Sequence, residues 1–198
     1  NVTLLLNNVN GQVVDQSNAA NTITENGTVL YSSESPGAGF NPSLNLDGNW
    51  NITGLYDGDL GGDFTIEMWV NTYSDATLQN GKFIEPNTAG SGTWTVQMDT
   101  TTQSIDINGL IGGSYQGSQD ISTQQWVHVA ITRSGTTLKR WVNGVGGTSV
   151  TNSDTFNNSD FKIGVTPGNI YLNDVRITKG VARYTGNFIP PTEKFPTS

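Results

Sequence analysis

The acidic side chains of this 198-residue chain could act as general acids or bases, but the sequence does not pair them. Hydrolysis of a glycosidic bond needs two carboxyl groups on a rigid element, about 5–5.5 Å apart for retention or about 6.5–9.5 Å apart for inversion. Glu67 stands alone on its expected strand, so a structural or surface role is expected for it. The glutamates are scattered over positions 25, 34, 67, 85 and 193.

The basic side chains give no catalytic device either. His128 is the one histidine, so it would have to be the base of any Ser-His-Asp arrangement. It lies in the middle of an expected strand, where a side chain satisfied between Trp126 and Ala130 is the ordinary arrangement. The chain has no cysteine, which excludes a disulfide framework, a thiolate metal site and a Cys nucleophile. We therefore predict that the protein is not an enzyme.

Aromatic and amide side chains point instead to carbohydrate recognition. A sugar site needs an aromatic face that stacks on CH groups, flanked by Asn, Asp or Gln side chains that orient the hydroxyls. We assign Trp69 and Trp126 to the core, and we expect Trp94 and Trp141 to be exposed and to lead the site. Packing in the core or between sheets is the competing explanation for each candidate aromatic residue. The candidates are Tyr73, Trp94, Tyr115 and Trp141, with the amides Asn108, Gln116 and Asn143 nearby in sequence.

The elements that position these residues are expected to be antiparallel strands. Asn-Gly and Asp-Gly pairs recur along the chain, and these pairs supply the positive φ angles of tight hairpins. Short runs of Val, Ile, Thr and aromatic residues lie between the turns, and no window shows helical spacing. Strands are expected near residues 2–6, 12–14, 28–31, 43–46, 64–71, 82–85, 93–98, 103–107, 126–133, 137–143, 160–165 and 169–178.

Residues 64–70 show the alternation of a half-buried strand. Phe64, Ile66 and Met68 fall on one face and Glu67 and Trp69 on the other, because successive side chains of a strand point to opposite sides. This alternation and the strand count predict an all-β fold, a two-sheet antiparallel β-sandwich. We expect a single domain over residues 1–198, with residues 186–198 forming a Pro-rich tail that packs on the domain or extends from it.

Four segments together resemble the concanavalin A-like, laminin G-like domains of bacterial surface proteins and phage appendages. The ending over residues 176–191 looks especially like the version found in phage and marine bacterial proteins. The resemblance implies a jelly roll, but relatives include lectins, glucanases, adhesion modules and structural decorations, so function must come from the site. The segments are 43–48, 63–70, 126–133 with 141–144, and 170–178.

The resemblance also bears on catalysis and on calcium. Related glucanases carry a Glu-x-Asp-x-x-Glu or Glu-x-Asp-x-Glu run on one strand, and this chain has none, which disfavours hydrolysis. Relatives often hold a structural calcium through an Asp of the last strand, where this chain has Asn173. Asp174 would compensate only if it pointed the same way, against strict alternation. The candidate calcium ligands are Asn173, Asp174 and Asp47.

An acidic loop over residues 57–63 is a second candidate for calcium. Its spacing lacks the Asx at the fifth position and the terminal Glu of an EF-hand, and turn chemistry is the competing explanation.

The charge of the chain restricts its partners. A net charge of −8 and a pI near 4.3 argue against nucleic acid and anionic membranes, which are bound through clustered Lys and Arg. No run of 18 apolar residues is present, so no membrane-spanning segment is expected. The charge would also repel sulfated or uronic polymers unless calcium bridged them, so we expect a neutral or weakly basic glycan.

The sequence therefore predicts a non-catalytic carbohydrate-binding or adhesion module of a phage appendage, such as a tail fibre or capsid decoration, or of a bacterial surface protein. The expected location is the virion surface, the cell surface or the extracellular space. Partners would be a glycan or cell-surface polysaccharide and other virion or surface proteins. A structural or protein-interaction domain is the second hypothesis and a glycoside hydrolase or lyase the third. An exposed aromatic groove would favour the first, a large apolar patch the second and a carboxylate pair in a cleft the third.

Overall fold

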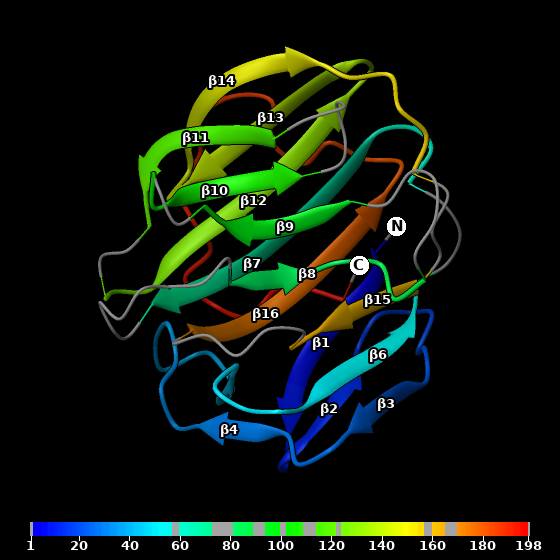
Figure 1. Cartoon of the computed structure of the whole chain (residues 1–198), viewed down its shortest axis with the longest axis vertical. Coiled ribbons are helices and arrows are strands. Elements are labelled where there is room, and N and C mark those ends of the chain that lie inside the picture. The colour runs from blue at the N-terminus through cyan, green and yellow to red at the C-terminus, as the bar shows by residue number, and fades with distance from the viewer. Residues whose placement is uncertain are drawn as a thin grey trace.

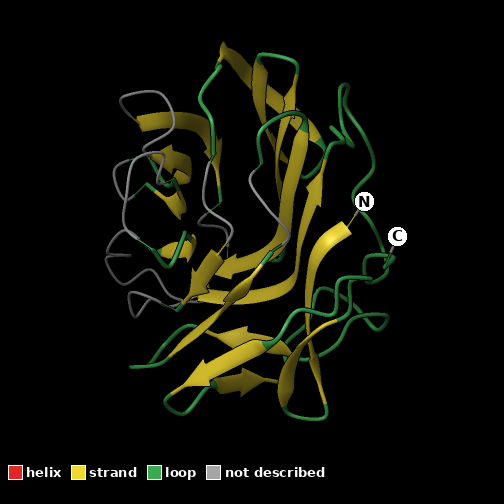
Figure 2. Cartoon of the chain, turned by 90° about the vertical axis from the view of Figure 1, so that its right-hand side faces the viewer, coloured by secondary structure: helices red, strands yellow, loops and turns green. Residues whose placement is uncertain are grey.

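The fold is all-β, as the sequence predicts (Figure 2). Sixteen strands and no helix occur in the described part of the chain, so no helix there could cross a membrane. The computed structural model describes residues 2–56, 60–72, 81–88, 94–99, 102–108, 114–121, 124–156, 160–164 and 170–197, with the backbone alone at 108 and 114–120.

The larger of two layers is an antiparallel sheet that we call the back sheet. Its long central strands, β7, β12 and β16, run through the middle of the molecule (Figure 1). A short pair, β4 (Leu30–Ser32) and β5 (Ser43–Asn45), joins it where β5 pairs with β16. The order is β14 (Val145–Thr151), β13 (Thr137–Val142), β12 (Val127–Ser134), β7 (Phe64–Thr72), β16 (Ile170–Lys179), β1 (Val2–Val9) and β2 (Gln12–Asp15).

The second layer, which we call the front sheet, lies in front of the back sheet in Figure 1. It consists of two antiparallel groups that meet through backbone hydrogen bonds of 3.0 and 2.7 Å between Glu85 and Lys162. The first group is β11 (Ser114–Asp120), β10 (Ser104–Asn108), β9 (Thr95–Met98) and β8 (Lys82–Ile84), and the second is β15 (Asp160–Ile163), β6 (Asn51–Leu55) and β3 (Ile23–Asn26).

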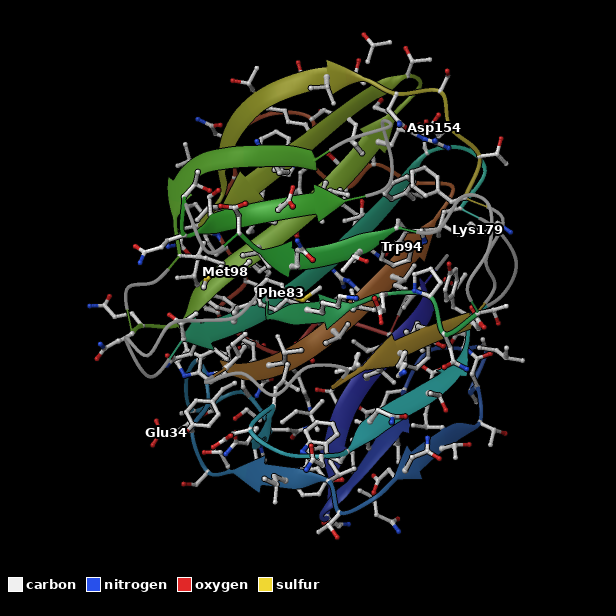
Figure 3. The ribbon with its side chains drawn as sticks, in the orientation of Figure 1. Glu34, Phe83, Trp94, Met98, Asp154 and Lys179 are labelled. Carbon is white, nitrogen blue, oxygen red and sulfur yellow. The ribbon has the colours of Figure 1, made fainter. Side chains whose placement is uncertain are left out.

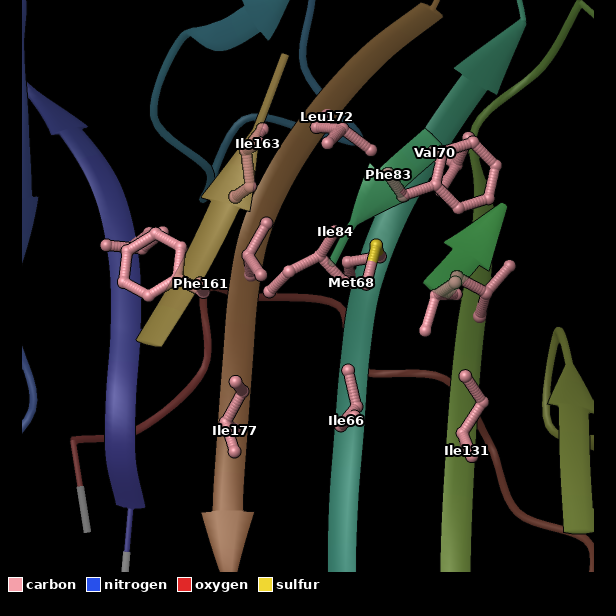
Figure 4. Packing of buried hydrophobic residues seen from close by; sticks show 14 of the residues in the cluster. Ile66, Met68, Val70, Phe83, Ile84, Ile131, Phe161, Ile163, Leu172 and Ile177 are labelled. Atoms are coloured by element: carbon pink, nitrogen blue, oxygen red, sulfur yellow. The ribbon is translucent and has the colours of Figure 1, made fainter. Parts of the chain in front are cut away.

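The main core lies between the two sheets. Ile66, Met68 and Val70 of β7 point into it, as the alternation predicts, and Phe83 and Phe161 of the front sheet lie over the back-sheet strands (Figure 4). Fully burying a side chain of this size contributes about 1.5–3 kcal/mol, so this cluster supplies most of the driving force for folding.

The outer face of the back sheet is covered as well. Residues 180–197, which we call the C-terminal segment, run behind the back sheet (red in Figure 1), and the chain end lies on the side that faces away from the front sheet (Figure 2). Phe195 is buried there in a second, smaller apolar cluster with Val2, Leu5 and Trp69, and Trp126 packs against this cluster while partly buried. Trp69 is therefore buried as predicted, but beneath the C-terminal segment and not between the sheets.

Glu67 is the polar centre of this outer layer. It is fully buried, and its Oε1 accepts hydrogen bonds from Nη2 and Nε of Arg176 at 2.6 and 2.9 Å. Tyr184 of the C-terminal segment donates its hydroxyl to Oε2 at 2.7 Å. His128 Nε2 lies 3.3 Å from Oε2, an ion-pair distance without hydrogen-bond alignment. The expected structural role of Glu67 is thus confirmed, and we call these four residues the Glu67 cluster.

The Glu67 cluster also joins the C-terminal segment to the sheet. Burial by itself would raise the pKa of Glu67, but its contacts with His128 and Arg176 outweigh burial and hold that pKa below its usual range. The Arg176 guanidinium lies 4.2 Å from the ring centroid of Phe195, and its Nη1 donates to the Pro196 carbonyl at 3.3 Å. Strands β7, β12 and β16 are therefore tied to the chain end through one carboxylate.

Replacing Glu67 with Gln tests this arrangement. The change leaves the Arg176 guanidinium buried without a counter-charge, so the free energy of unfolding at pH 7 should fall by about 3–5 kcal/mol in denaturant titrations. The Tyr184→Phe control removes one hydrogen bond and should cost about 1–2 kcal/mol. Because the carboxylate pKa is lowered in the fold, its stabilisation is lost as pH falls through that pKa, so the two proteins should converge in acid. Equal stability of the two proteins at pH 7 would show that the Glu67 charge does not stabilise the fold.

Candidate functional site

The structure buries both leading aromatic candidates. Trp94 is 1% exposed and belongs to the core between the sheets (Figure 3). Trp141 is 0% exposed, and the C-terminal segment covers it, with its ring centroid 6.5 Å from that of Tyr184 and 5.8 Å from that of Phe188. The expectation that both indoles are exposed is therefore wrong, since a fully buried ring offers no face to a sugar.

Asn143 is exposed, but the β13–β14 turn uses its side chain. It adopts a positive φ of 47°, and its Oδ1 accepts a hydrogen bond of 3.0 Å from the backbone N–H of His128. The following Gly144 also has a positive φ, and an added Cβ there would lie 1.8 Å from the Phe188 carbonyl oxygen. Asn143 therefore shapes a turn that the C-terminal segment packs against.

The other candidates fall at the edge of what the structure describes. Tyr73 lies outside the described residues, as do the side chains of Tyr115, Gln116 and Asn108. In the backbone register, Gln116 of β11 lies opposite Asp106 of β10. Sugar binding by these four residues stays a prediction.

A polar row crosses the outer face of the front sheet. Gln97 Nε2 donates to Asp106 Oδ2 at 3.2 Å, and Lys82 pairs with Glu85 at 2.8 Å. Asp106 is only 1% exposed. These contacts occupy Gln97 Nε2, Asp106 Oδ2 and Lys82 Nζ, so these atoms are poorly available to a ligand.

The described surface is hollowed near the N-terminus. A depression of about 530 Å³, which we call the N-terminal hollow, opens between the β1–β2 turn, β4 and the chain that leads into β5. Its volume suits a small oligosaccharide, because ligand sites commonly span about 300–1,000 Å³. Its walls are Asn8, Val9, Asn10, Gly11, Tyr31, Ser32, Ser33, Asn41 and Pro42.

Tyr31 is the aromatic residue of the hollow, and it is held in place. Its hydroxyl donates to Glu25 Oε1 at 2.8 Å, and its partly buried ring packs against the main core. Burial and the neighbouring Glu25 carboxylate raise the pKa of Tyr31, so the hydroxyl stays protonated and keeps donating. A ring fixed in this way loses little conformational entropy when a ligand binds.

Three asparagines present amide groups to the hollow. Asn8 Oδ1 accepts from the Gly11 N–H at 3.0 Å, an interaction that fixes the side chain and leaves Nδ2 available. Within the described part of the chain, no hydrogen bond uses the side-chain amides of Asn10 or Asn41. Each free amide can donate to and accept from a hydroxyl group. The hollow thus combines a rigid ring with unsatisfied amides.

A small buried chamber adjoins the hollow, with Asn8 and Pro42 lining both. Most of its walls are apolar side chains of β1, β2, β5 and β16. We define the chamber by Asn7, Asn173 and Asp174, which are at least nine-tenths buried.

Because of a β-bulge in β16, Asn173 and Asp174 both line the chamber. Asn173 pairs with Trp69 and Arg176 with Glu67, so β16 carries one extra residue here, and Asp174 takes a positive φ of 54°. Strict alternation fails at the bulge, which corrects the expectation that the two side chains point apart.

The chamber contains oxygen atoms without partners. Asn173 Oδ1, Asp174 Oδ1 and both amide atoms of Asn7 are buried and make no hydrogen bond in the described structure. Burial raises the pKa of Asp174 to about 6, although the Phe195 N–H and the nearby Asn7 amide oppose the rise. Unsatisfied buried oxygens of this kind are typical of sites for water or a cation.

The oxygens fit calcium in type, since Ca²⁺ prefers carboxylate and amide oxygens. The described residues hold no group of three or more acidic, His or Cys ligands. Asp47 does not join the chamber: Asn45 pairs with Tyr171 and Leu44 with Leu172, so Asp47 lies about four residues, roughly 13 Å, from Asn173 along β16.

The acidic loop is described only in part. Residues 57–59 lie outside the described ranges, and Asp63 Oδ1 accepts a hydrogen bond of 2.7 Å from the Gly135 N–H. Asp63 thus supports the distant β12–β13 turn, and the choice between calcium binding and turn chemistry for the loop stays a prediction.

The comparisons with known proteins agree with this architecture. A family model described as the concanavalin A-like lectin/glucanases superfamily matches residues 47–182, more than half of the chain. Among curated proteins none matches the sequence.

Solved structures with the same fold include bacterial toxin binding domains. The binding domain of botulinum neurotoxin serotype G is 18% identical, with a TM-score of 0.70 over 90% of this chain and 47% of that one. The binding domain of Paraclostridial Mosquitocidal Protein 1 is 17% identical, with a TM-score of 0.71 over 90% and 49%. A structure of botulinum neurotoxin type C, whose cell entry is dependent upon interaction with two ganglioside molecules, is 15% identical, with a TM-score of 0.65 over 89% and 47%. This chain thus spans about half the length of these domains.

The raised pKa of Asp174 makes stability depend on pH. Between the ordinary value of 3.8 and about 6, the folded carboxyl is protonated while the unfolded one is not, so stability falls as pH rises through this window. The loss should reach at most about 3 kcal/mol. The Asp174→Asn variant should not show this loss of stability. The measurement is a denaturant titration of both proteins at pH 4 and pH 7, with a chelator present to remove metal ions. Parallel pH profiles of the two proteins would contradict the burial of this carboxyl.

Proposed function

The chain belongs to the concanavalin A-like lectin/glucanase superfamily, and we propose that this protein is a non-catalytic carbohydrate-binding module whose site is the N-terminal hollow. One observation carries the proposal: Tyr31 is held rigidly beside side-chain amides of Asn8, Asn10 and Asn41 that the protein leaves unsatisfied. A rigid ring stacks on the CH face of a sugar, and free amides orient its hydroxyls.

The chemistry of the hollow favours a neutral or weakly basic glycan. No charged side chain lines it, and the Glu25 carboxylate is engaged by the Tyr31 hydroxyl. The net charge of −8 disfavours an anionic polymer at this position. The similar toxin domains are binding domains, and cell entry of one of these toxins depends on gangliosides, which supports a glycan as the class of ligand.

We place the module on a phage appendage or a bacterial surface protein, exposed on the virion, the cell surface or outside the cell. The resemblance of residues 176–191 to domains of phage and marine bacterial proteins supports this placement. A structural or protein-interaction domain stays the second candidate. The large apolar side chains exposed in the described residues are spread over β4, β6, β14 and the C-terminal segment: Leu30, Leu55, Val145, Val181 and Ile189.

We also propose that the chamber holds a structural calcium through Asn7, Asn173 and Asp174. The support is the set of unpartnered oxygens, one of them a carboxylate oxygen. A bound calcium would neutralise the buried Asp174 and tie β1 to β16 below the floor of the hollow.

Calcium should therefore raise the melting temperature of the chelated protein. Binding to the folded state alone stabilises it by about 2.7 kcal/mol when free calcium is a hundredfold above its dissociation constant. The Asp174→Asn variant, which keeps the shape of the side chain, should gain much less from calcium in the same thermal scan. A wild-type melting temperature that calcium leaves unchanged would contradict a structural calcium in the chamber.

Sugar binding is tested with a microbial glycan array followed by titration of the best neutral oligosaccharide. Tyr31→Ala should weaken binding by about 1–3 kcal/mol, by analogy with aromatic stacking on nucleobases, while Tyr31→Phe should retain most of the affinity because it keeps the ring. Asn41→Ala should weaken binding without changing the melting temperature.

The matched control is Trp141→Ala, which should lose about 3–5 kcal/mol of stability because that ring is buried. Absence of any array signal, or full affinity in both Tyr31→Ala and Asn41→Ala, would overturn the proposal.

A further inference from the structure

A second hollow lies on the outer face of the back sheet, where the C-terminal segment leaves part of the β12–β13 hairpin open. We call it the hairpin hollow; its volume is about 220 Å³, enough for one sugar residue. It is separate from the N-terminal hollow and shares no residue with it. Its walls are Thr132, Ser134, Thr137, Lys139, Trp141, Tyr184 and Thr185.

Lys139 is a cation without an acidic partner in this hollow. Its Nζ lies 4.6 Å from the Trp141 ring centroid, and within the described residues it forms no ion pair. Lys82, by contrast, pairs with Glu85, and Arg176 pairs with Glu67. A cation–π contact fixes the position of an ammonium group but leaves its charge available to an anion.

The neighbouring strand is shaped to hold Lys139 in this place. An added Cβ at Gly146 of β14 would lie 2.5 Å from Lys139 Cε and 2.8 Å from Trp141 Cζ3. Only a residue without a side chain therefore leaves room for the lysine to lie along the indole. Lys139, Trp141 and Gly146 together build a positioned charge.

The rest of the hollow can bind hydroxyl groups. Ser134, Thr137 and Thr185 are exposed, and no hydrogen bond in the described part of the chain uses their hydroxyls. Thr132 differs, because it accepts from Trp141 Nε1 at 2.8 Å and donates to the Tyr184 carbonyl at 3.1 Å. No acidic residue lines the hollow, and Lys139 is its one charged residue. The hollow thus offers one cation ringed by hydroxyls in a protein of net charge −8.

We propose that the hairpin hollow binds a sugar residue that carries a carboxylate, with Lys139 as the partner of the carboxylate. The sugar hydroxyls would exchange hydrogen bonds with Ser134, Thr137 and Thr185. This inference rests on the proposed function in taking a glycan as the ligand, but it adds a second site of opposite selectivity. A glycan with both neutral and acidic residues could then engage two faces of the molecule.

The test compares glucuronate with glucose, which differ in the carboxylate, by NMR titration of the whole chain with inorganic sulfate as a third probe. Glucuronate should bind and shift the resonances of Lys139 and Thr185, whereas glucose and sulfate should not. Lys139→Gln should weaken glucuronate binding about tenfold or more, as loss of a charge-assisted hydrogen bond implies, with an unchanged melting temperature. Gly146→Ala, which displaces the lysine, should weaken it in the same direction.

Lys162→Gln is the matched control, because it removes the same charge from the front sheet and should leave glucuronate binding intact. Tyr31→Ala should also leave it intact, so failure of this site and failure of the N-terminal hollow are distinguishable. Equal binding of glucose overturns the role of the carboxylate, and equal binding of sulfate overturns the sugar as the ligand. Full affinity in Lys139→Gln overturns the proposal as a whole.

Discussion

The structure depends on how one buried carboxylate is satisfied on the outer face of the back sheet. An unpaired charge at Glu67 would be costly, so Arg176 supplies its counter-charge and the Tyr184 hydroxyl adds a further hydrogen bond. Tyr184 belongs to the C-terminal segment and Arg176 to the last strand. The Glu67 cluster therefore forms only when the end of the chain has folded back over the sheet, which couples this layer to the completion of the sandwich.

The same covering decides which surfaces are open to ligands. The C-terminal segment buries Trp141 and leaves the hairpin hollow beside it. The bulge at Asp174 anchors the segment through the Phe195 N–H and turns a second polar side chain into the chamber below the N-terminal hollow. The proposed ligand sites thus lie where the covering layer ends, and the sandwich beneath serves as their rigid support.

The fold was largely predictable because alternation and turn pairs are local signals. Each of the twelve expected strands overlaps an observed one. Strands β3, β6, β11 and β14 were not predicted, because they consist largely of polar residues or glycines and show no apolar alternation. The sites were not predictable in this way. Trp141 follows the pattern of an outward-facing residue, and only a segment some forty positions later buries it. The sequence around Tyr31 gives no sign of a binding site, because the asparagines that line the hollow with it come from other segments of the chain.

The N-terminal hollow is proposed to receive a neutral glycan. The most direct measurement is a map of backbone amide shifts in the whole chain as the best-binding neutral oligosaccharide is titrated. The largest shifts should fall at Asn8, Asn10, Tyr31 and Asn41, with little change across β8, β9 and β10. Largest shifts along the outer face of the front sheet, around Gln97 and Asp106, would contradict this proposal.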